Sequence, residues 1–346
     1  MRSSVDAALQ RIWYGRSPWF TACAWLLAPL SWIFASVALL RRWAYRSGAL
    51  RAVRVSRPVI VVGNVTVGGT GKTPFVIWLA ECLRARGLRP GIITRGYGGA
   101  AHIWPQRVTA DSDAGQVGDE ALLLALRTRA IVIAGPNRVD DARAAIELGA
   151  DVILSDDGLQ HYGLARDVEI AVLDGERGVG NGRYLPAGPL REGVSRLGRV
   201  DLLAITRRGG LQADAFVPQS ATPCVEVRHR LGDAYSLVNG ERRALAALQG
   251  RRVHAVAGIG HPQAFFDALR AAGLEVDGRA LPDHAPIASN VLQFEDALDI
   301  LMTEKDAVKC RALADRRCWA VELVVELPEA DRVRLLSIVD QALRRD

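Results

Sequence analysis

Residue types able to bind nucleotide phosphates are concentrated in one glycine-rich segment. It reads GNVTVGGTGKT over Gly63–Thr73 and continues a short apolar run, Pro58–Gly63. Glycines let backbone N–H groups converge on phosphate oxygens, and a helix that begins at the end of the loop adds the positive end of its dipole. Lys72 would then reach the β- and γ-phosphates of ATP, and the Thr73 hydroxyl would bind Mg²⁺.

This loop differs from the common GxxxxGK[ST] pattern at its first position, where the chain has Thr66. Its core is similar to the loops of deviant-Walker ATPases, which carry a signature lysine where this chain has Val67. A glycine-rich turn without a ligand is the simpler alternative, but the strand before the loop and the Lys-Thr pair at its end favour nucleotide binding. The expected nucleotide contacts are Thr66, Val67, Gly68, Gly69, Thr70, Gly71, Lys72 and Thr73.

Two adjacent carboxylates end a second apolar run. Asp156 and Asp157 follow Val152–Ser155, and the end of a buried strand is where a P-loop fold holds its metal or activating water. A turn capped by aspartate is the alternative, and the spacing does not decide which carboxylate would touch Mg²⁺. His161, a little further on, fits either a place behind the site or a structural role.

Three further segments carry reactive residue types with less specific spacing. Asp119 follows Gly118 at an expected helix start, where a catalytic base and an acid placed for the helix dipole fit equally. The loop Gly182–Glu192 contains arginine and glutamate, which bind phosphate and metal, although a plain surface loop has the same composition. His284 follows Asp283, and a lone histidine is more often structural than catalytic.

The elements that position these residues alternate between strands and helices. Such alternation predicts an α/β fold, with a P-loop NTPase-like parallel sheet flanked by helices. Strands are predicted over 58–63, 90–94, 130–134, 151–155, 169–173 and 202–206, and helices over 74–86, 119–127 and 139–148.

The pattern changes near residue 210. Residues 225–230 and 234–237, followed by Asn239-Gly240, predict antiparallel hairpin structure around a tight turn. Strands over 253–257 and 300–303 and helices over 262–272 and 329–344 predict a smaller C-terminal α/β unit. The expected domains are 1–50, an N-terminal membrane-associated helix with a linker; 51–210, the P-loop core; and 211–346, the smaller α/β domain with its hairpin linker.

The N-terminal segment has the length and composition of a membrane helix. No residue from Ser17 to Leu40 is charged, and about 20 such residues cross a bilayer core. Arginines flank both ends, and tryptophans within the segment suit a membrane interface. The stretch is longer than the apolar part of a signal peptide. A spanning helix, a helix that Pro29 bends into the interface and a core helix of a soluble protein remain the alternatives.

The composition is that of a folded chain with a basic surface. Of 346 residues, 49% are hydrophobic, and the net charge is +6. This excess suits a membrane surface or a phosphorylated substrate. No basic run is interleaved with aromatics, so no nucleic-acid partner is expected. The five cysteines lack CxxC spacing, which indicates neither a disulfide framework nor a zinc site and fits a reducing compartment.

Taken together, these motifs resemble those of one family, the tetraacyldisaccharide 4′-kinases of lipid A biosynthesis. The likeness runs from about residue 10 to the C-terminus, and it is specific because the divergent P-loop and the TEKD stretch are unusual together. The segments that carry it are Gly63–Pro74, Ile93–Gly99, Val117–Glu120, Ser155–His161, Gly188–Glu192, Ala257–Gly260, Pro282–His284 and Met302–Lys309.

The resemblance implies an inner-membrane enzyme of Gram-negative bacteria whose active site faces the cytoplasm. It would use ATP and Mg²⁺ to phosphorylate the 4′-hydroxyl of a tetraacyldisaccharide 1-phosphate, an acylated glucosamine disaccharide lipid, and so form lipid IVA. It would work at the membrane surface without an obligate protein partner. The family pattern makes Asp119 the base and His284 its helper. It also gives Lys72 and Thr73 to phosphate and Mg²⁺, and lets Asp157 and Glu192 assist at the metal.

Two other functions fit the same residues. A deviant-Walker switch ATPase shares the loop core, although the N-terminal anchor and Val67 argue against it. A non-catalytic nucleotide-binding membrane protein would leave the acidic residues near the loop without a role.

Overall fold

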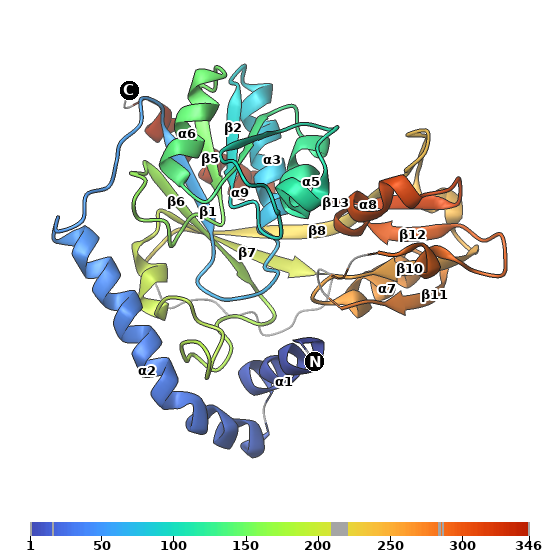
Figure 1. The fold of residues 1–346 in the computed structure, drawn as a ribbon, viewed down its shortest axis with the longest axis horizontal. Helices are drawn as coiled ribbons and strands as arrows, with labels where there is room; N and C mark the ends of the chain where they lie inside the picture. The colour runs from blue at the N-terminus through green and yellow to red at the C-terminus, as the bar shows by residue number, and fades with distance from the viewer. Residues whose placement is uncertain (1, 16, 209–220, 283–284, 286, 345–346) are drawn as a thin grey trace.

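The computed structural model describes residues 2–15, 17–208, 221–282, 285 and 287–344 (Figure 1). Within them the strands form one continuous sheet in the order β11-β10-β12-β13-β8-β7-β6-β1-β5-β2-β4-β3, with β9 paired to β8. The strands are β1 Val59–Gly63, β2 Pro90–Thr94, β3 Gln106–Val108, β4 Ile131–Ala134, β5 Val152–Asp156, β6 Val168–Asp174, β7 Leu202–Arg208, β8 Cys224–Ser236, β9 Arg242–Arg243, β10 Arg252–Ala257, β11 Glu275–Ala280, β12 Ile300–Thr303 and β13 Cys318–Glu326.

Helices cover this sheet and precede it. The α-helices are α1 Arg2–Tyr14, α2 Pro18–Arg46, α3 Lys72–Ala85, α4 Ala114–Val117, α5 Asp119–Arg127, α6 Arg138–Glu147, α7 Pro262–Ala271, α8 Glu304–Cys310 and α9 Glu329–Leu343. Short 3₁₀ turns are η1 Val194–Arg199, η2 Leu245–Leu248, η3 Ser289–Leu292 and η4 Arg311–Leu313.

The predicted parallel core is confirmed. From β7 through β6, β1, β5 and β2 to β4, neighbouring strands are parallel, and β3 closes this edge antiparallel to β4. Parallel strands end at the same edge of a sheet, so the loops that follow β1, β2 and β5 leave the core side by side. This edge therefore receives the glycine-rich loop and the two aspartates.

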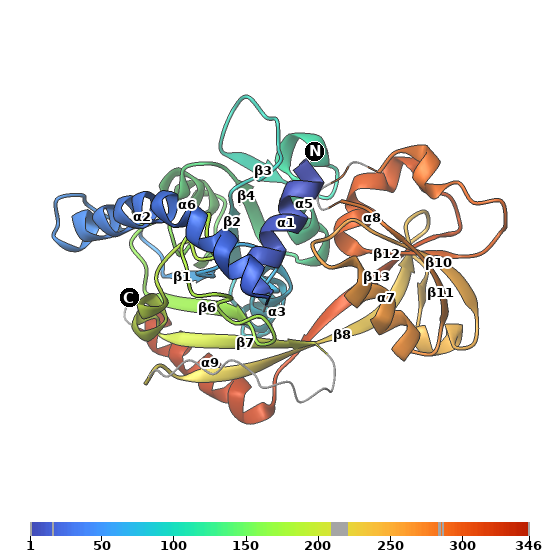
Figure 2. The same cartoon turned by 90° about the horizontal axis from the view of Figure 1, so that it is seen from below.

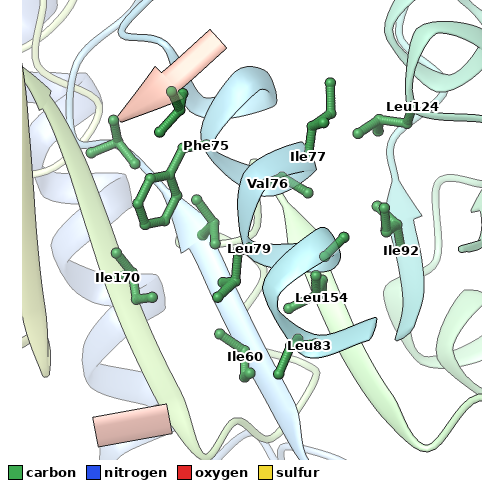
Figure 3. Close-up of a cluster of buried hydrophobic side chains, with 14 of the residues drawn as sticks. Ile60, Phe75, Val76, Ile77, Leu79, Leu83, Ile92, Leu124, Leu154 and Ile170 are labelled. Atoms are coloured by element: carbon green, nitrogen blue, oxygen red, sulfur yellow. The ribbon is translucent and has the colours of Figure 1, made fainter. Parts of the chain in front are cut away.

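The central strand β1 is apolar along its whole length because helices bury both of its faces. Alternate residues point to opposite sides, so Ile60 and Val62 face one helix layer while Val59 and Val61 face the other. The first layer contains α3, whose Phe75, Leu79 and Leu83 lie against the strands (Figure 3). Helices α5 and α9 share that face, and α6 contributes to the opposite one.

The predicted segments 225–230 and 234–237 are not separate strands, because residues 224–236 form the single strand β8. Gly232, between them, lies so close to β13 that a Cβ there would be 2.7 Å from the Val324 side chain. The pairing shifts register at this point, because Val321 pairs with Ala234 and Leu323 with Leu231, which leaves one extra residue in β8. The turn at Asn239-Gly240 does reverse the chain, since β9 pairs antiparallel with the end of β8.

Strands β8 and β13 join the two halves of the molecule (Figure 1). Residues 224–229 of β8 pair in parallel with β7, and residues 228–236 pair antiparallel with β13. Beyond them, β12, β10 and β11 form the smaller α/β unit, with α7 and α8 beside them (Figure 2). Helix α9 returns to the core, where Leu335 and Val339 are buried. The expected domain boundary near residue 210 lies outside the described residues.

Helix α2 runs along the outside of the core, and Pro29 does not end it (Figure 1). Within the described residues it is the helix that is long and apolar enough to cross a membrane, and only 17% of its most apolar window is buried. Its buried residues are Ala24, Ala28 and Ser31. The large apolar side chains that it exposes are Trp19, Trp25, Leu26, Leu30, Trp32, Ile33, Phe34, Val37, Leu39, Leu40 and Trp43.

Candidate functional site

The glycine-rich loop after β1 lies against the backbone of residues 189–192. The Val67 N–H donates to the Pro189 carbonyl at 2.8 Å, and the Arg191 N–H donates to the Val65 carbonyl at 2.7 Å. Gly71 precedes α3 with a φ of 83°, a left-handed conformation that suits glycine. The loop therefore leads directly into the N-terminus of α3, whose first N–H groups lack helical partners.

Lys72, Asp157 and Arg191 form a charged cluster beside this loop. The Lys72 Nζ lies 3.5 Å from Asp157 Oδ1, and the Arg191 guanidinium lies 2.9 Å from Asp157 Oδ2. Burial raises the pKa of Asp157, but the two cations outweigh it and hold that pKa below its usual range. The cluster thus keeps a carboxylate charged and places two cations where phosphates would lie.

Asp156 and Thr73 offer a second pair of oxygen atoms beside the glycine-rich loop. Thr73 Oγ1 donates to Asp156 Oδ2 at 3.5 Å. Asp156 is buried, and its Oδ1 has no partner among the described residues. Burial, followed by the nearby charge of Glu120, raises the pKa of Asp156 to about 7. A cation bound here would remove that unfavourable burial of charge.

The donor set fits Mg²⁺ better than a metal held by protein alone. No cluster of three or more His, Cys, Asp or Glu side chains able to hold a metal occurs in the described part of the chain. Mg²⁺ is usually bound by one or two protein oxygens together with substrate phosphates and waters. A hydroxyl and a carboxylate beside a phosphate-binding loop match that preference.

A buried arginine contacts the backbone at the first of the two aspartates. Arg138, at the start of α6, donates from Nη2 to the Asp156 carbonyl at 3.1 Å and lies 3.4 Å from Asp141 Oδ2. Asp157 itself has a φ of 51°, so the chain turns sharply just after the strand. The Arg138 contact fixes the carbonyl before that turn and helps to aim the Asp157 carboxylate at Lys72.

Glu192 lies in a different set of contacts from the other predicted metal ligands. Its Oε2 accepts from the Tyr162 hydroxyl at 2.6 Å and lies 3.4 Å from the Arg196 Nε, while its Oε1 is buried without a partner in the described residues. Burial and the charge of Glu192 raise the pKa of Tyr162, which keeps this phenol protonated as a donor. The structure therefore brings Thr73 to Asp156 and Lys72 to Asp157, and Glu192 to Tyr162.

Asp119 begins α5 at a turn that only glycines allow. Gly118, just before it, has a φ of 91°. A Cβ at Gly118 would lie 2.5 Å from the Tyr97 carbonyl, and one at Gly99 would lie 2.4 Å from the Gln116 carbonyl. The glycine-rich segment after β2 thus packs on this turn and sets where α5 begins.

Helix α8 of the smaller unit meets the start of α5. Lys309 Nζ lies 3.8 Å from Asp119 Oδ2 and 3.1 Å from Asp306 Oδ1, and Lys305 Nζ lies 3.4 Å from Glu120 Oε1. Asp306 is buried and also accepts from the Gly258 N–H at 2.9 Å. The TEKD stretch and the Gly-Ile-Gly segment therefore meet at Asp306. Asp283 and His284 lie outside the described residues.

Sequence reasoning missed three side chains that hold the loop. Thr206 Oγ1 lies 3.1 Å from the Thr70 carbonyl, and Gln160 donates to the Asn64 carbonyl at 2.9 Å. The His229 ring packs so closely on Gly71 that a Cβ there would be 2.2 Å from a ring carbon. Gln160 belongs to a motif seen in the sequence, whereas strand pairing alone brings Thr206 and His229 to the loop.

Comparison with known proteins matches the chain to one family. A family model described as tetraacyldisaccharide-1-P 4′-kinase matches residues 23–344. The tetraacyldisaccharide 4′-kinase of Nitrosococcus oceani is 45% identical over 99% of this chain and 97% of its own length. That of Alkalilimnicola ehrlichii is 46% identical over 94% of this chain and 95% of its own length.

A solved structure agrees as well. The crystal structure of an "apo" form of LpxK from Aquifex aeolicus in complex with ATP has a TM-score of 0.81 and 27% identity, and the match covers 93% of this chain and 99% of that one. The family resemblance, the fold class and the assignment as a kinase are thereby confirmed. The chain belongs to the tetraacyldisaccharide-1-P 4′-kinase family.

Proposed function

We propose that this protein transfers the γ-phosphate of ATP to the 4′-hydroxyl of a tetraacyldisaccharide 1-phosphate and so forms lipid IVA. Family membership supports the acceptor. The observation that carries the chemistry is the charged cluster of Lys72, Asp157 and Arg191 beside the glycine-rich loop. Phosphoryl transfer depends mainly on positioning and on neutralising charge, and this cluster supplies both.

ATP would bind with its phosphates on Thr66–Thr73. The N–H groups at the start of α3 and the Lys72 ammonium would take the β- and γ-phosphates. When ATP binds, Lys72 and Arg191 would interact with the phosphate oxygens as well as with Asp157. Asp157 then keeps the two cations ordered before ATP binds.

Mg²⁺ would be held by Thr73 with Asp156, the buried carboxylate whose Oδ1 has no described partner. Bound there, it would neutralise charge on the phosphate oxygens. Asp157 and Glu192 remain predicted helpers at this site. The contacts of Asp157 with cations and of Glu192 with Tyr162 fit roles in ordering the loop.

Asp119 is the proposed base for the 4′-hydroxyl. A sugar hydroxyl at neutral pH needs a base within hydrogen-bond reach. The charge of Glu120, next to Asp119, is close enough to raise the pKa of Asp156, which supports placing the start of α5 at the site. His284 is proposed to assist Asp119 by the family pattern alone.

The enzyme would work at the cytoplasmic surface of the inner membrane. Helix α2 exposes a broad apolar face that suits lipid. A lipid acceptor lies in the bilayer, so a helix that holds the core at the interface would bring the acceptor to the site. Arginines after the apolar stretch suit anionic headgroups.

The test is transfer of labelled γ-phosphate from ATP to a purified tetraacyldisaccharide 1-phosphate in detergent micelles. Wild type should label the lipid, and Asp119→Asn should lower kcat by roughly 10²- to 10⁴-fold while ATP binding is retained. Exposed Asp111→Asn, in the loop before α4, serves as the matched control. A folded wild type that binds ATP, labels no lipid and releases phosphate without acceptor would instead indicate a switch ATPase.

A further inference from the structure

A polar residue within the apolar stretch of α2 contacts the core. Ser31 is only 5% exposed, on a helix whose large side chains mostly face outward. Its hydroxyl donates to the Tyr184 carbonyl at 2.8 Å and accepts from the Ala187 N–H at 2.9 Å. Ala24 and Ala28 continue the same buried side of the helix. The small residues let α2 approach closely enough for Ser31 to hold two backbone groups.

Helix α1 contacts the same stretch of backbone, residues 181–187, at a second point. The Trp13 indole N–H donates to the Pro186 carbonyl at 2.8 Å, and Trp13 is 6% exposed. The Asn181 N–H donates back to the Trp13 carbonyl at 2.9 Å. Both N-terminal helices therefore contact one short backbone segment, Tyr184–Ala187.

That segment is one side of a turn formed by residues 183–190, and the other side of this turn contacts the glycine-rich loop. Within the turn, the Leu185 N–H donates to the Leu190 carbonyl at 3.0 Å, and the Leu190 N–H donates to the Arg183 carbonyl at 3.1 Å. Leu190 bridges Thr66, and the Pro189 carbonyl accepts from the Val67 N–H. A shift of the side that touches α2 is thus passed on to the side that touches the loop.

The same turn places one of the site cations. Arg191 follows Leu190 directly, its N–H donates to the Val65 carbonyl at 2.7 Å, and its side chain holds Asp157. Three consecutive residues after the α2 contact therefore touch either the loop backbone or the charged cluster.

We infer that Ser31 is a positioning residue that couples the docking of α2 to the geometry of the ATP-binding loop. The inference rests on the proposed function only in taking Thr66–Thr73 as the ATP site. Losing the hydroxyl leaves the Ala187 N–H buried without its acceptor and frees the turn to move. The loop would then hold ATP less well, although α2 keeps its entire apolar face for the membrane.

The experiment measures ATP affinity by calorimetry with MgCl₂, using the full chain in detergent micelles. Ser31→Ala should weaken ATP binding about threefold to tenfold, the usual effect of one or two lost hydrogen bonds. KM for ATP should rise equally, with KM for the lipid acceptor unchanged. Ser36→Ala is the matched control, because the Ser36 hydroxyl is exposed and, among the described residues, donates within α2 to the Trp32 carbonyl.

Two more variants separate positioning from simple damage to the helix. Ser31→Thr keeps the hydroxyl and should restore affinity, since a cavity of about 190 Å³ lined by Ala28, Trp32 and Arg183 adjoins this position. Trp13→Phe removes the hydrogen bond from the Trp13 indole to the Pro186 carbonyl and should also weaken ATP binding. Vesicle co-sedimentation of all variants should match wild type.

The outcomes distinguish this inference from the proposed function. Equal ATP affinity in wild type and Ser31→Ala overturns the coupling, whatever the acceptor. Weaker ATP binding that Ser31→Thr does not restore also overturns it, because the hydroxyl would not be the cause. A wild type that binds ATP but labels no lipid overturns the proposed acceptor alone, and weaker ATP binding by Ser31→Ala would still support the coupling.

Discussion

At the scale of single residues, Asp156 and Asp157 are adjacent but lie in opposite electrostatic settings. Asp157 lies between two cations that lower its pKa, whereas burial raises the pKa of Asp156 to about 7. The peptide between them turns by way of the positive φ of Asp157. Asp157 can therefore order Lys72 and Arg191, while Asp156 is suited to bind a cation.

His161, in the same motif, gives a pH-dependent prediction. Burial, and then the charge of Arg138, lower its pKa from 6.5 to about 4. Between these values the unfolded chain binds a proton that the folded chain does not, so the free energy of unfolding should fall as pH drops from 6.5 towards 4. His161→Gln should lose less stability over that window, measured by urea unfolding at pH 7 and pH 5 in detergent.

The control for this prediction is His102→Gln, because His102 is exposed in the loop before β3. It should follow wild type at both pH values. If His161→Gln and wild type lose equal stability between pH 7 and pH 5, the buried neutral state of His161 is contradicted.

The sequence locates the residues of contiguous motifs but not their partners. Lys72 and Thr73 follow from one loop pattern, and the Asp-Asp pair follows from its place after an apolar run. That Lys72 meets Asp157 while Thr73 meets Asp156 depends on the turn at Asp157, which no spacing rule gives. Arg138 and Thr206 touch the site from other elements, and no local pattern marks them.

At the scale of elements, the strands of the core are the most predictable feature. Strands such as β1 and β2 are buried on both faces, so their apolar runs end where the strand ends. The single strand β8 was not foreseen, because Leu231-Gly232-Asp233 resembles a turn in the sequence. Only the pairing with β13 shows that the chain continues as one strand past Gly232, with an extra residue in β8 at this point.

Helix α8 gives a prediction at this scale, because it reaches from the smaller unit to the start of α5. Lys309 is 5% exposed and lies between Asp306 and Asp119. Lys309→Met keeps the length of the side chain but removes the charge that orients the Asp119 carboxylate. We expect kcat for lipid phosphorylation to fall about tenfold or more, with KM for ATP unchanged, in steady-state assays.

Two variants control for effects on stability. Lys309→Arg retains the charge and should recover much of the lost kcat, whereas exposed Arg311→Met, two residues later, should behave as wild type. A Lys309→Met enzyme with wild-type kcat would show that α8 does not orient Asp119. A rise in KM for ATP alone would place the effect at the glycine-rich loop instead.

At the scale of the whole molecule, one sheet runs through both halves. Strands β8 and β13 cross between them, and α9 then packs on the core although it follows the smaller unit in sequence (Figure 1). Residues from both halves therefore contribute to the same hydrophobic cluster, which includes Val325, Leu335 and Val62. Local patterns predict most elements of the core but neither β13 nor α8, and this exchange between halves depends on long-range pairing that the sequence does not display.

The exposed face of α2 gives the prediction for the molecule as a whole. Ile33 and Val37 are each 63% exposed, one turn apart on a helix that buries only a narrow stripe against the core. We expect lipid to cover these exposed apolar side chains. Transfer of one Ile or Val side chain from water to lipid contributes about 1.5–3 kcal/mol to membrane binding. The double variant Ile33→Asp, Val37→Asp should therefore bind vesicles of phosphatidylethanolamine and phosphatidylglycerol at least about tenfold more weakly in co-sedimentation.

The ATP affinity of the double variant in detergent should match wild type, because neither side chain lies on the buried stripe that carries Ser31. Leu313→Asp, at an exposed apolar position of the smaller unit, is the control and should bind vesicles as wild type does. Undiminished vesicle binding by the double variant would mean that another surface meets the membrane, and α2 would then need a different partner for its apolar face.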